Sequence, residues 1–413
     1  MSEIIKNFKG EMQDVIENNI LPFWLKYMQD HEQGGFYGQM KGDGTLVKDA
    51  DKGCILNARI LWAFSAAYRV LGKAEYLAAA TRAKDYILEH FIDHEFGGAY
   101  WSLDYKGQPV DTKKQFYAIG FVIYGLSEYA RATHNLEALD QALQLFHCIE
   151  EHSFDPDNNG YIEAQTREWG TIADMRLSDL DANYPKSQNT HLHIIEPYTN
   201  LYRVLKDLVS CPKHAEAYSA VTLDVEKALR NLITIFTDRI LNPETHHLDL
   251  FFEMDWTRGA GWLESYGHDI ECSWLMHEAA LVLGDKDVLA KVEPIVQLVA
   301  KASEKGLNTD GSMTHEANVD TGHVDDDRHW WVQAEAVVGF YNIYQYFGDE
   351  AALQKCLNAW QYIKDNLIDH ELGEWYWSRD PQRNINKTDD HAGFWKCPYH
   401  NSRMCLEIIE RNL

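Results

Sequence analysis

Hydrophobic residues recur at intervals of three and four along most of the chain. The segments ILNARILWAFSAAYRVLG from Ile55, AEYLAAATRAKDYILEHF from Ala74 and LDVEKALRNLITIFTDRIL from Leu223 all show this spacing. A period of about 3.6 residues predicts amphipathic helices. Between these segments lie turns, most of them with glycine, each followed by a short run of aromatic or apolar residues. This pattern predicts short β-hairpins in the loops that connect the helices.

The turns themselves repeat along the chain. DHEFGGAYWS begins at Asp93 and DHELGEWYWS begins at Asp369, and the two segments share seven of their ten letters. Related turns are marked by Gly35, Gly98, Gly160, His247, Gly311 and Gly373, which are separated by 63, 62, 87, 64 and 62 residues. Self-similarity at a nearly constant interval is typical of a repeat architecture.

Two helices in each of six repeats predict an all-α protein of about twelve helices. Helical pairs of this kind form either an open solenoid or a closed toroid, the (α/α)6 barrel, and the number six favours closure. No linker rich in Pro, Gly or Ser divides the chain, so we predict a single domain over residues 1–413. Residues 210–224 lie in the one long interval and are interpreted as an insertion at an outer helix junction.

One helix in each repeat is predicted to begin with polar and aromatic residues before it becomes apolar. The first turns of these six helices are predicted to hold Arg59, Tyr117, His193, His268, Trp331 and His400. In a closed barrel these helices would form the inner ring. Their first turns would then meet at one end, together with free backbone N–H groups and the positive ends of the helix dipoles. This arrangement predicts a pocket for a polar ligand.

Acidic residues accompany two of these histidines. Glu271 follows His268 by three residues, a spacing at which a carboxylate on the same helix face can orient the imidazole. Glu196 follows His193 by the same spacing. A single histidine at a helix start is more often a capping or core residue, whereas three at equivalent positions favour a chemical role.

Charge and composition narrow the possible partners. The formal charge of −26 argues against nucleic acid or an anionic membrane, because both would repel the protein. The 13 Trp and 22 Tyr residues offer flat faces that suit sugar rings, although most are expected to fill the core. The seven Cys residues contain no CxxC motif, which is typical of a reducing compartment. Without an apolar leader or a run of about 18 apolar residues, the protein is predicted to be cytoplasmic and without a membrane span.

Other kinds of site are weakly indicated. The segment HEANVDTGHVDDDRH, residues 315–329, has the composition of a metal site, but its spacing matches no familiar set of ligands, so we predict no bound metal. A glycoside hydrolase on the same barrel would need two carboxylates flanking the scissile bond, which the histidine-rich helix starts disfavour. A non-catalytic scaffold for protein partners is a further alternative, but it would not need three histidines at converging helix starts.

Four separated motifs resemble the N-acylglucosamine 2-epimerase family. They are RHWWVQAEA from Arg328, SYGHDIECSW from Ser265, NTHLHIIEPYTNL from Asn189 and FWKCPYHNSRMC from Phe394. The resemblance extends over nearly the whole chain and implies the (α/α)6 barrel. It also implies reversible epimerisation, without a cofactor, at C2 of the reducing-end glucose of β-1,4-linked disaccharides such as cellobiose and lactose, which gives a mannose end. The sugar would be the partner of a monomer or weak dimer.

The resemblance also implies a set of site residues. The catalytic residues would be Arg59, His193, His268, Glu271 and His400. The substrate-binding residues would be Tyr117, Asn189, Trp274, Trp331, Glu335 and Trp395. The insertion at 210–224 is expected to leave this site intact.

The expected reaction explains why histidines are needed. The C2 proton of an aldose becomes acidic only after the ring opens, and inversion requires that the proton return from the opposite face of the enediolate. Imidazole suits both steps, because its ordinary pKa of about 6.5 lets it accept and donate protons near neutral pH. We expect His268 and His400 to form the acid–base pair, with Glu271 orienting His268.

The remaining residues have expected roles in binding and charge stabilisation. His193 would assist ring opening, and Arg59 would stabilise the enediolate. Tyr117 and Asn189 would hydrogen-bond to hydroxyls, and Trp331 and Trp395 would stack on sugar rings. The alternative is a monosaccharide or N-acylglucosamine 2-epimerase, or an aldose–ketose isomerase, that uses the same enediolate.

Overall fold

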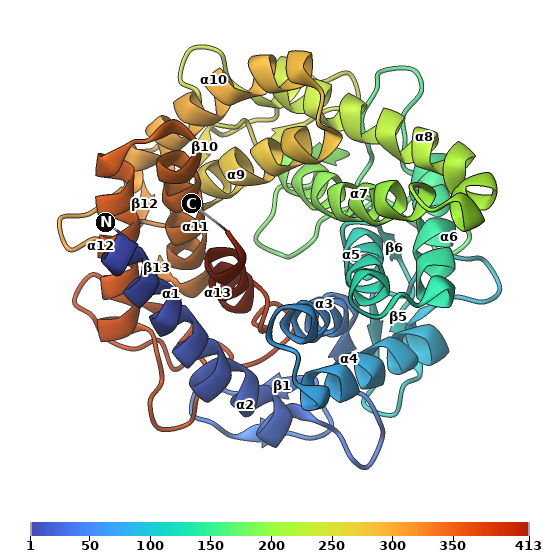
Figure 1. The fold of residues 1–413 in the computed structure, drawn as a ribbon, viewed down its shortest axis with the longest axis horizontal. Helices are drawn as coiled ribbons and strands as arrows, with labels where there is room; N and C mark the ends of the chain where they lie inside the picture. The colour runs from blue at the N-terminus through green and yellow to red at the C-terminus, as the bar shows by residue number, and fades with distance from the viewer. Residues whose placement is uncertain (1, 412–413) are drawn as a thin grey trace.

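The computed structural model of the protein describes residues 2–411 as two concentric rings of helices (Figure 1). The inner ring consists of α3 (Cys54–Leu71), α5 (Phe116–Thr133), α7 (Gln188–Val209), α9 (Tyr266–Leu283), α11 (Trp330–Phe347) and α13 (His400–Glu410). The outer ring begins with α1 (Ser2–Val15), η1 (Ile16–Ile20), α2 (Leu21–Phe23) and η2 (Trp24–Met28). It continues with α4 (Ala74–Tyr86), η3 (Ile87–Phe91), α6 (Leu136–His152), α8 (Pro212–Ile235), η4 (Phe236–Ile240), α10 (Lys286–Ser303), η5 (Glu304–Gly306) and α12 (Glu350–Asn366).

The inner ring is closed. Each inner helix packs against the next one, α13 packs against α3, and α1 lies against α13, so the two ends of the chain meet (Figure 1). The predicted (α/α)6 barrel is therefore confirmed. The apolar inner helix α3 is long enough to span a membrane, with a mean hydropathy of 1.2, but 78% of it is buried, as expected for a helix at the core of a barrel.

Each turn of the repeated series forms a short hairpin, as predicted. The six turns are closed by the antiparallel bridges Gln29↔Phe36, Ile92↔Ala99, Phe154↔Tyr161, Leu241↔Leu248, Leu307↔Met313 and Ile368↔Trp375. The short strands are β1 (Gln39–Met40), β2 (Leu46–Val47), β3 (Lys52–Gly53), β4 (Ser102–Leu103), β5 (Pro109–Asp111), β6 (Lys114–Gln115), β7 (Ala164–Gln165), β8 (Lys186–Ser187), β9 (Phe251–Phe252), β10 (Leu263–Ser265), β11 (Glu316–Asn318), β12 (Val324–Asp325), β13 (Arg328–His329) and β14 (Ser378–Arg379).

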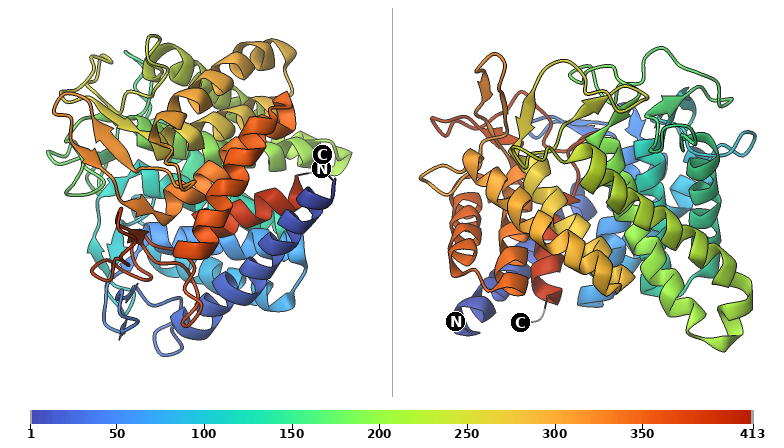
Figure 2. Two further views of the ribbon diagram at one scale, coloured as in Figure 1. Left: turned by 90° about the vertical axis from the view of Figure 1, so that its left-hand side faces the viewer. Right: turned by 90° about the horizontal axis from the view of Figure 1, so that it is seen from above.

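These strands join neighbouring repeats at one end of the barrel, which we call the mouth. The strand that precedes an inner helix pairs with the strand that follows the next turn, as in β3 with β4 and β6 with β7. Figure 2 shows the strands and loops gathered at this end, where the inner helices begin. The repeated turns therefore position the starts of the inner helices around the mouth.

Buried ion pairs strengthen this connection. The Lys114 side chain, just before α5, donates hydrogen bonds of 2.8 Å to Asp93 Oδ2 and to the Gly97 carbonyl in the turn DHEFGG. The same arrangement links Lys52 to Asp30 at 2.8 Å, with both side chains almost fully buried. A lysine thus ties a turn to the inner helix that follows it, which explains why the turns have such similar sequences.

The long interval contains more than the predicted insertion. Helices α7 and α8 have 22 and 24 residues, against 18 and 17 in α5 and α6. Their connection protrudes at the end of the barrel opposite the mouth (Figure 2), which is consistent with an intact site. A second extension, the loop at 166–185 between β7 and β8, lies at the mouth itself. The insertion interpreted at 210–224 is therefore only part of the surplus, because loop and helix extensions share the interval.

Candidate active site

A pocket of about 270 Å³ opens at the mouth of the barrel. Nine of the eleven predicted site residues line it: Arg59, Tyr117, Asn189, His193, His268, Glu271, Trp331, Trp395 and His400. The other two, Trp274 and Glu335, are fully buried beside it. The inner helices thus bring most of the predicted residues together, as the converging helix starts require.

The predicted residues do not all lie in the first turn of their helices. Tyr117, His268, Trp331 and His400 do, whereas Arg59 and His193 are the sixth residues of α3 and α7. These two helices begin earlier than the sequence pattern indicated, because they start directly after the strands β3 and β8. Arg59 and His193 therefore lie about one helical turn, roughly 5 Å, deeper along the barrel axis.

Glu335 orients His400. The Nδ1 atom of His400 lies 2.6 Å from Glu335 Oε1, while Trp274 donates a hydrogen bond of 2.9 Å to Glu335 Oε2. Both oxygens of Glu335 accept hydrogen bonds, Oε1 from Arg403 and Oε2 from Trp274. We therefore assign the hydrogen of the His400 contact to Nδ1, which leaves the lone pair of Nε2 free. Glu335 and Trp274 therefore support a site histidine rather than contact the substrate, in contrast to their predicted roles.

The predicted pairing of Glu271 with His268 is wrong. The Nδ1 atom of His268 lies 2.8 Å from the Ser265 hydroxyl, whereas Glu271 Oε1 accepts a hydrogen bond of 2.5 Å from Arg403. Glu271 Oε1 also lies 3.8 Å from Nδ1 of His400. The spacing of three residues places two side chains on one helix face, but the long Arg403 side chain of α13 reaches Glu271 and supplies a stronger partner for the carboxyl group.

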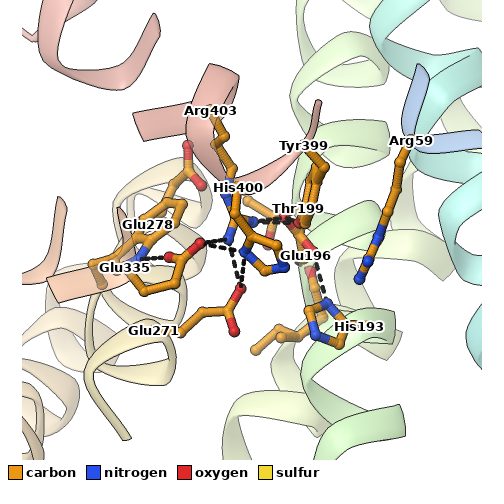
Figure 3. A network of polar contacts seen from close by, with 12 residues as sticks. Arg59, His193, Glu196, Thr199, Glu271, Glu278, Glu335, Tyr399, His400 and Arg403 are labelled. Atoms are coloured by element: carbon orange, nitrogen blue, oxygen red, sulfur yellow. Dashed lines mark hydrogen bonds and ion pairs between the residues drawn. The ribbon is translucent and has the colours of Figure 1, made fainter. Parts of the chain in front are cut away.

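Arg403 is the centre of a buried network (Figure 3). Its fully buried guanidinium contacts three carboxyl groups, those of Glu196, Glu271 and Glu335. Burial, together with the negative charge of Glu335, raises the pKa of Glu271 well above its ordinary value, even though Arg403 opposes this shift. This shift favours the protonated form of Glu271, which lines the pocket and whose Oε2 is buried and without a partner among residues 2–411.

Glu196 orients the second histidine. His193 Nδ1 lies 3.0 Å from Glu196 Oε2, so this predicted contact is confirmed. Tyr399 donates a hydrogen bond to the other oxygen of Glu196, beside the contact with Arg403. Burial alone would raise the pKa of Glu196, but Arg403 and His193 hold it below the ordinary value. Glu196 therefore remains an anion and fixes the orientation of the His193 ring.

The three predicted catalytic histidines, His193, His268 and His400, all have lowered pKa values, which favour the neutral imidazole. Burial lowers the pKa of His400 well below its ordinary value, and the positive charges of Arg59 and Arg403 add to this effect. Loss of solvent around the ring likewise holds the pKa of His268 well below the ordinary value. The pKa of His193 is lowered by burial despite its contact with Glu196. Neutral imidazoles are the form that accepts a proton.

Arg59 is a buried cation without a buried counterion. Its Nη2 donates a hydrogen bond of 2.8 Å to the Tyr117 hydroxyl, and its Nε has no hydrogen-bond partner in the described part of the chain. The guanidinium carbon lies 4.2 Å from the ring centre of Phe121 and 4.7 Å from that of Tyr399. No carboxylate of residues 2–411 forms an ion pair with it, so its positive charge is available to a ligand in the pocket.

Aromatic side chains form the walls of the pocket. The Trp331 ring lies 4.9 Å from that of His268 and 5.6 Å from that of His400. Trp395 lies on another side, 6.1 Å from Tyr117, and is partly exposed. Asn189, at the start of α7, has a buried side-chain oxygen without a partner among the described residues. These flat and polar surfaces are suited to a sugar.

Several site residues were missed by the sequence analysis. They are Leu177, Ser178, Leu180 and Asp181 from the loop at 166–185, His315, His329, Trp330 and Trp377 in the pocket wall, and Arg403 and Tyr399 beneath it. A signal existed for Arg403, which is the only Arg or Lys between His400 and Glu410. The loop residues carried no such signal, because nothing in their sequence indicates that they fold over the mouth.

Two groups of side chains within residues 2–411 could hold a metal ion by geometry. The first, Glu271, Glu335 and His400, is buried and already bonded to Arg403. An ion there would face the positive charge of Arg403, so this group does not suit a cation. The second group, His315, Asp325 and His329, lies at the pocket rim and is considered below.

Fold and site together define a helical-barrel enzyme that carries out acid–base chemistry on a small polar ligand. The profile of the family described as N-acylglucosamine 2-epimerase (GlcNAc 2-epimerase) matches residues 35–402, and the chain belongs to this family.

Relatives match the chain over nearly its whole length. It is 56% identical to a cellobiose 2-epimerase of Bacteroides fragilis, over 99% of this chain and 100% of that protein. It is 39% identical to a cellobiose 2-epimerase of Ruminococcus albus, over 98% and 99% of the two chains. The structure of cellobiose 2-epimerase from Bacillus thermoamylovorans superposes with a TM-score of 0.91 at 42% identity, over 98% of this chain and 100% of the other.

Proposed function

We propose that the protein is a cellobiose 2-epimerase. It interconverts glucose and mannose at the reducing end of β-1,4-linked disaccharides such as cellobiose and lactose. The observation that carries this proposal is the single pocket in which neutral His268 and His400 lie beside the unpaired cation Arg59. The relatives named cellobiose 2-epimerase, which match over nearly their entire length, support the same activity.

The reaction begins with opening of the sugar ring. His193, oriented by Glu196, is placed to move the proton between O1 and O5 that ring opening requires. The resulting aldehyde at C1 makes the C2 proton acidic. One imidazole then takes that proton, and the electrons of the C2–H bond form the C1=C2 bond of an enediolate, with negative charge on O1.

Inversion at C2 follows from two bases. His268 and His400 both contact Trp331 but come from different helices, α9 and α13, and they are held by different partners, Ser265 and Glu335. We assign one to each face of the enediolate, so that one takes the proton and the other returns it. The direction of the reaction decides which histidine acts first.

The charge that develops on the enediolate is met by two groups. Arg59 supplies a fixed positive charge that forms no direct ion pair with a carboxylate of residues 2–411, and such preorganised charge is often the largest contribution to catalysis. Glu271, with its raised pKa, offers a protonated Oε2 that can donate a hydrogen bond to the substrate. The proposed route consists of proton transfers only and therefore requires no cofactor.

The outer half of the pocket supports a disaccharide as the substrate. Beyond the three histidines, the wall continues with Trp377 and with Leu177 and Asp181 of the loop at 166–185. This surface would hold the second sugar of a disaccharide. The alternative, a monosaccharide or N-acylglucosamine 2-epimerase or an aldose–ketose isomerase, would leave it unused.

A single experiment tests the proposal against its alternatives. The protein is incubated in D2O with cellobiose, glucose, mannose or N-acetylglucosamine, without metal or nucleotide, and C2 is followed by NMR. We expect deuterium at C2 and a mannose end in the disaccharide. Release of free glucose would indicate a hydrolase, a ketose product would indicate an isomerase, and no change in any sugar would refute the epimerase.

Two further properties belong to this proposal. All seven cysteines are free thiols in the structure, which supports a reducing, cytoplasmic location. A protein with a charge of −26 and a sugar-sized pocket needs no nucleic-acid or membrane partner for this reaction, and we propose that it acts as a monomer or weak dimer.

A further inference from the structure

Three potential metal ligands meet at the rim of the pocket, outside the proposed catalytic groups. His315 precedes β11, Asp325 ends β12 and His329 ends β13. The strands β11 and β12 form a hairpin in which Glu316 pairs with Asp325, and the His315 side chain, next to Glu316, contacts Asp325. The sequence spacings of ten and four residues resemble no familiar ligand set, so only the hairpin reveals the cluster.

The three ligand atoms are almost as close to one another as the ligands of a bound transition metal. His315 Nδ1 lies 2.8 Å from Asp325 Oδ2, and His329 Nε2 lies 3.9 Å from the same oxygen. The two imidazole rings are stacked with centres 4.2 Å apart. All three ligand atoms lie within 4.8 Å of one another. Ligands at about 2.0–2.1 Å from a tetrahedral ion are separated by roughly 3.3 Å, so small side-chain rotations would complete the site.

The ligand types indicate the class of ion. Two imidazoles and one carboxylate suit borderline ions such as Zn²⁺ or Co²⁺, whereas Mg²⁺ and Ca²⁺ prefer oxygen ligands. The three side chains are 16–39% exposed, so an ion could enter and would keep open coordination positions.

The cluster forms part of the pocket wall, so an ion bound there would lie where a ligand enters. His315 and His329 line the pocket, and the His315 ring lies 5.7 Å from that of Trp331, next to the proposed catalytic histidines. We propose that His315, Asp325 and His329 bind one divalent ion of the zinc class, and that the bound ion obstructs the place of the second sugar. Binding of the ion is independent of the proposed function, whereas obstruction of the second sugar rests on that function.

Metal binding is tested first, with the full chain free of affinity tags and stripped with a chelator. Zn²⁺ is titrated by calorimetry, and Co²⁺ is followed by its visible absorption bands. We expect one ion per chain in the wild type and affinity at least about tenfold weaker in Asp325→Asn and in His329→Ala. The matched control is His323→Ala, which removes an exposed histidine from the same hairpin and should leave affinity unchanged. Circular dichroism establishes that each variant is folded.

The outcomes separate the two parts of the inference. Absence of binding at millimolar metal, or binding that Asp325→Asn does not weaken, overturns the site. If the site is present, Zn²⁺ should raise KM for cellobiose in the wild type and in His323→Ala but not in Asp325→Asn. Binding without this rise in KM overturns the obstruction alone. A protein that binds the ion but acts on no sugar refutes the proposed function and leaves the metal site standing.

Discussion

The Nδ1 atom of His400 lies 2.6 Å from the Oε1 atom of Glu335, which joins the first residue of α13 to the sixth residue of α11. This contact fixes the hydrogen on Nδ1 and leaves Nε2 of His400 free to accept the C2 proton. The two residues are 65 positions apart in the sequence. Their relationship therefore depends on the packing of α13 against α11.

Glu335→Gln should impair the reaction through His400. The amide cannot hold the imidazolium that forms during proton transfer, and it can also donate to Nδ1 and so favour the wrong tautomer. We expect kcat to fall about 10²- to 10⁴-fold with little change in KM, as measured by NMR assay of cellobiose epimerisation. Trp274→Phe is the matched control, because it removes a donor from Glu335 but keeps the carboxylate. An equal loss in both variants would assign Glu335 a structural role only.

Replacing either base should stop epimerisation but preserve exchange of the C2 proton in one of the two epimers. His268→Asn and His400→Asn should each lower epimerisation at least about 10²-fold. If the two histidines act on opposite faces, each variant should still exchange the C2 proton of one epimer with D2O, and the retained epimer should differ between them. The measurement is deuterium incorporation into cellobiose and into its mannose-ended epimer. Loss of exchange from both epimers in both variants would contradict the two-base assignment.

The pH profile should extend to the acidic side. The pKa values of His193, His268 and His400 are all lowered by burial, so the neutral imidazoles persist below the ordinary pKa of about 6.5. We therefore expect kcat/KM to remain near its plateau at pH 6.5 and to decline only at lower pH. An acidic midpoint at or above pH 6.5 would contradict the burial of these groups.

The alkaline side of the profile should depend on Glu271. Its pKa is raised by burial and by Glu335, so it is protonated at low pH and loses its proton as the pH rises through the raised value. If the protonated form is the active one, activity should fall on the alkaline side in the wild type. Glu271→Gln mimics the protonated form and should show a flatter alkaline limb. An identical alkaline limb in both proteins would exclude Glu271 as its origin.

The unpaired charge of Arg59 predicts a preference for anionic ligands. The aldonic acid of cellobiose carries negative charge at C1, as the enediolate does, whereas the corresponding alditol is neutral. Arg59→Gln should weaken inhibition by the aldonate about 10- to 100-fold, which corresponds to roughly 1.5–3 kcal/mol for a hydrogen bond to a charged group. Inhibition by the alditol should change much less. Equal losses for the two inhibitors would show that Arg59 contributes shape rather than charge.

The buried lysines should matter for stability. Lys52→Met leaves Asp30 as a buried charge without its partner, and we expect the free energy of unfolding to fall by about 3–5 kcal/mol. Lys48→Met is the control, because Lys48 and Glu32 are both exposed and such pairs contribute about 0–1 kcal/mol. Chemical denaturation of both variants measures the difference. Equal stability would mean that Lys52 does not tie the turn to α3.

Sequence pattern alone was sufficient for the fold and for most of the pocket. The interval between turns such as those at Asp93 and Asp369 predicted six repeats, and a helical period of 3.6 predicted which faces are buried. Because six equivalent helices start at the same end, residues at equivalent positions, such as Tyr117 and Trp331, had to come together. Local propensity and repeat symmetry determine these features, and both can be read without coordinates.

Only the tertiary structure decided which side chains contact one another. The expected contact of Glu271 with His268 is replaced by contacts with Arg403 and His400, because both of these side chains reach Glu271 from α13. The cluster of His315, Asp325 and His329 likewise exists only through the pairing of β11 with β12. Hydrogen bonds and charges act over a few ångströms, and those distances are set by how distant segments pack. Spacing along the chain predicts neighbours on one helix, but the protonation and the partners of the site depend on neighbours from other helices.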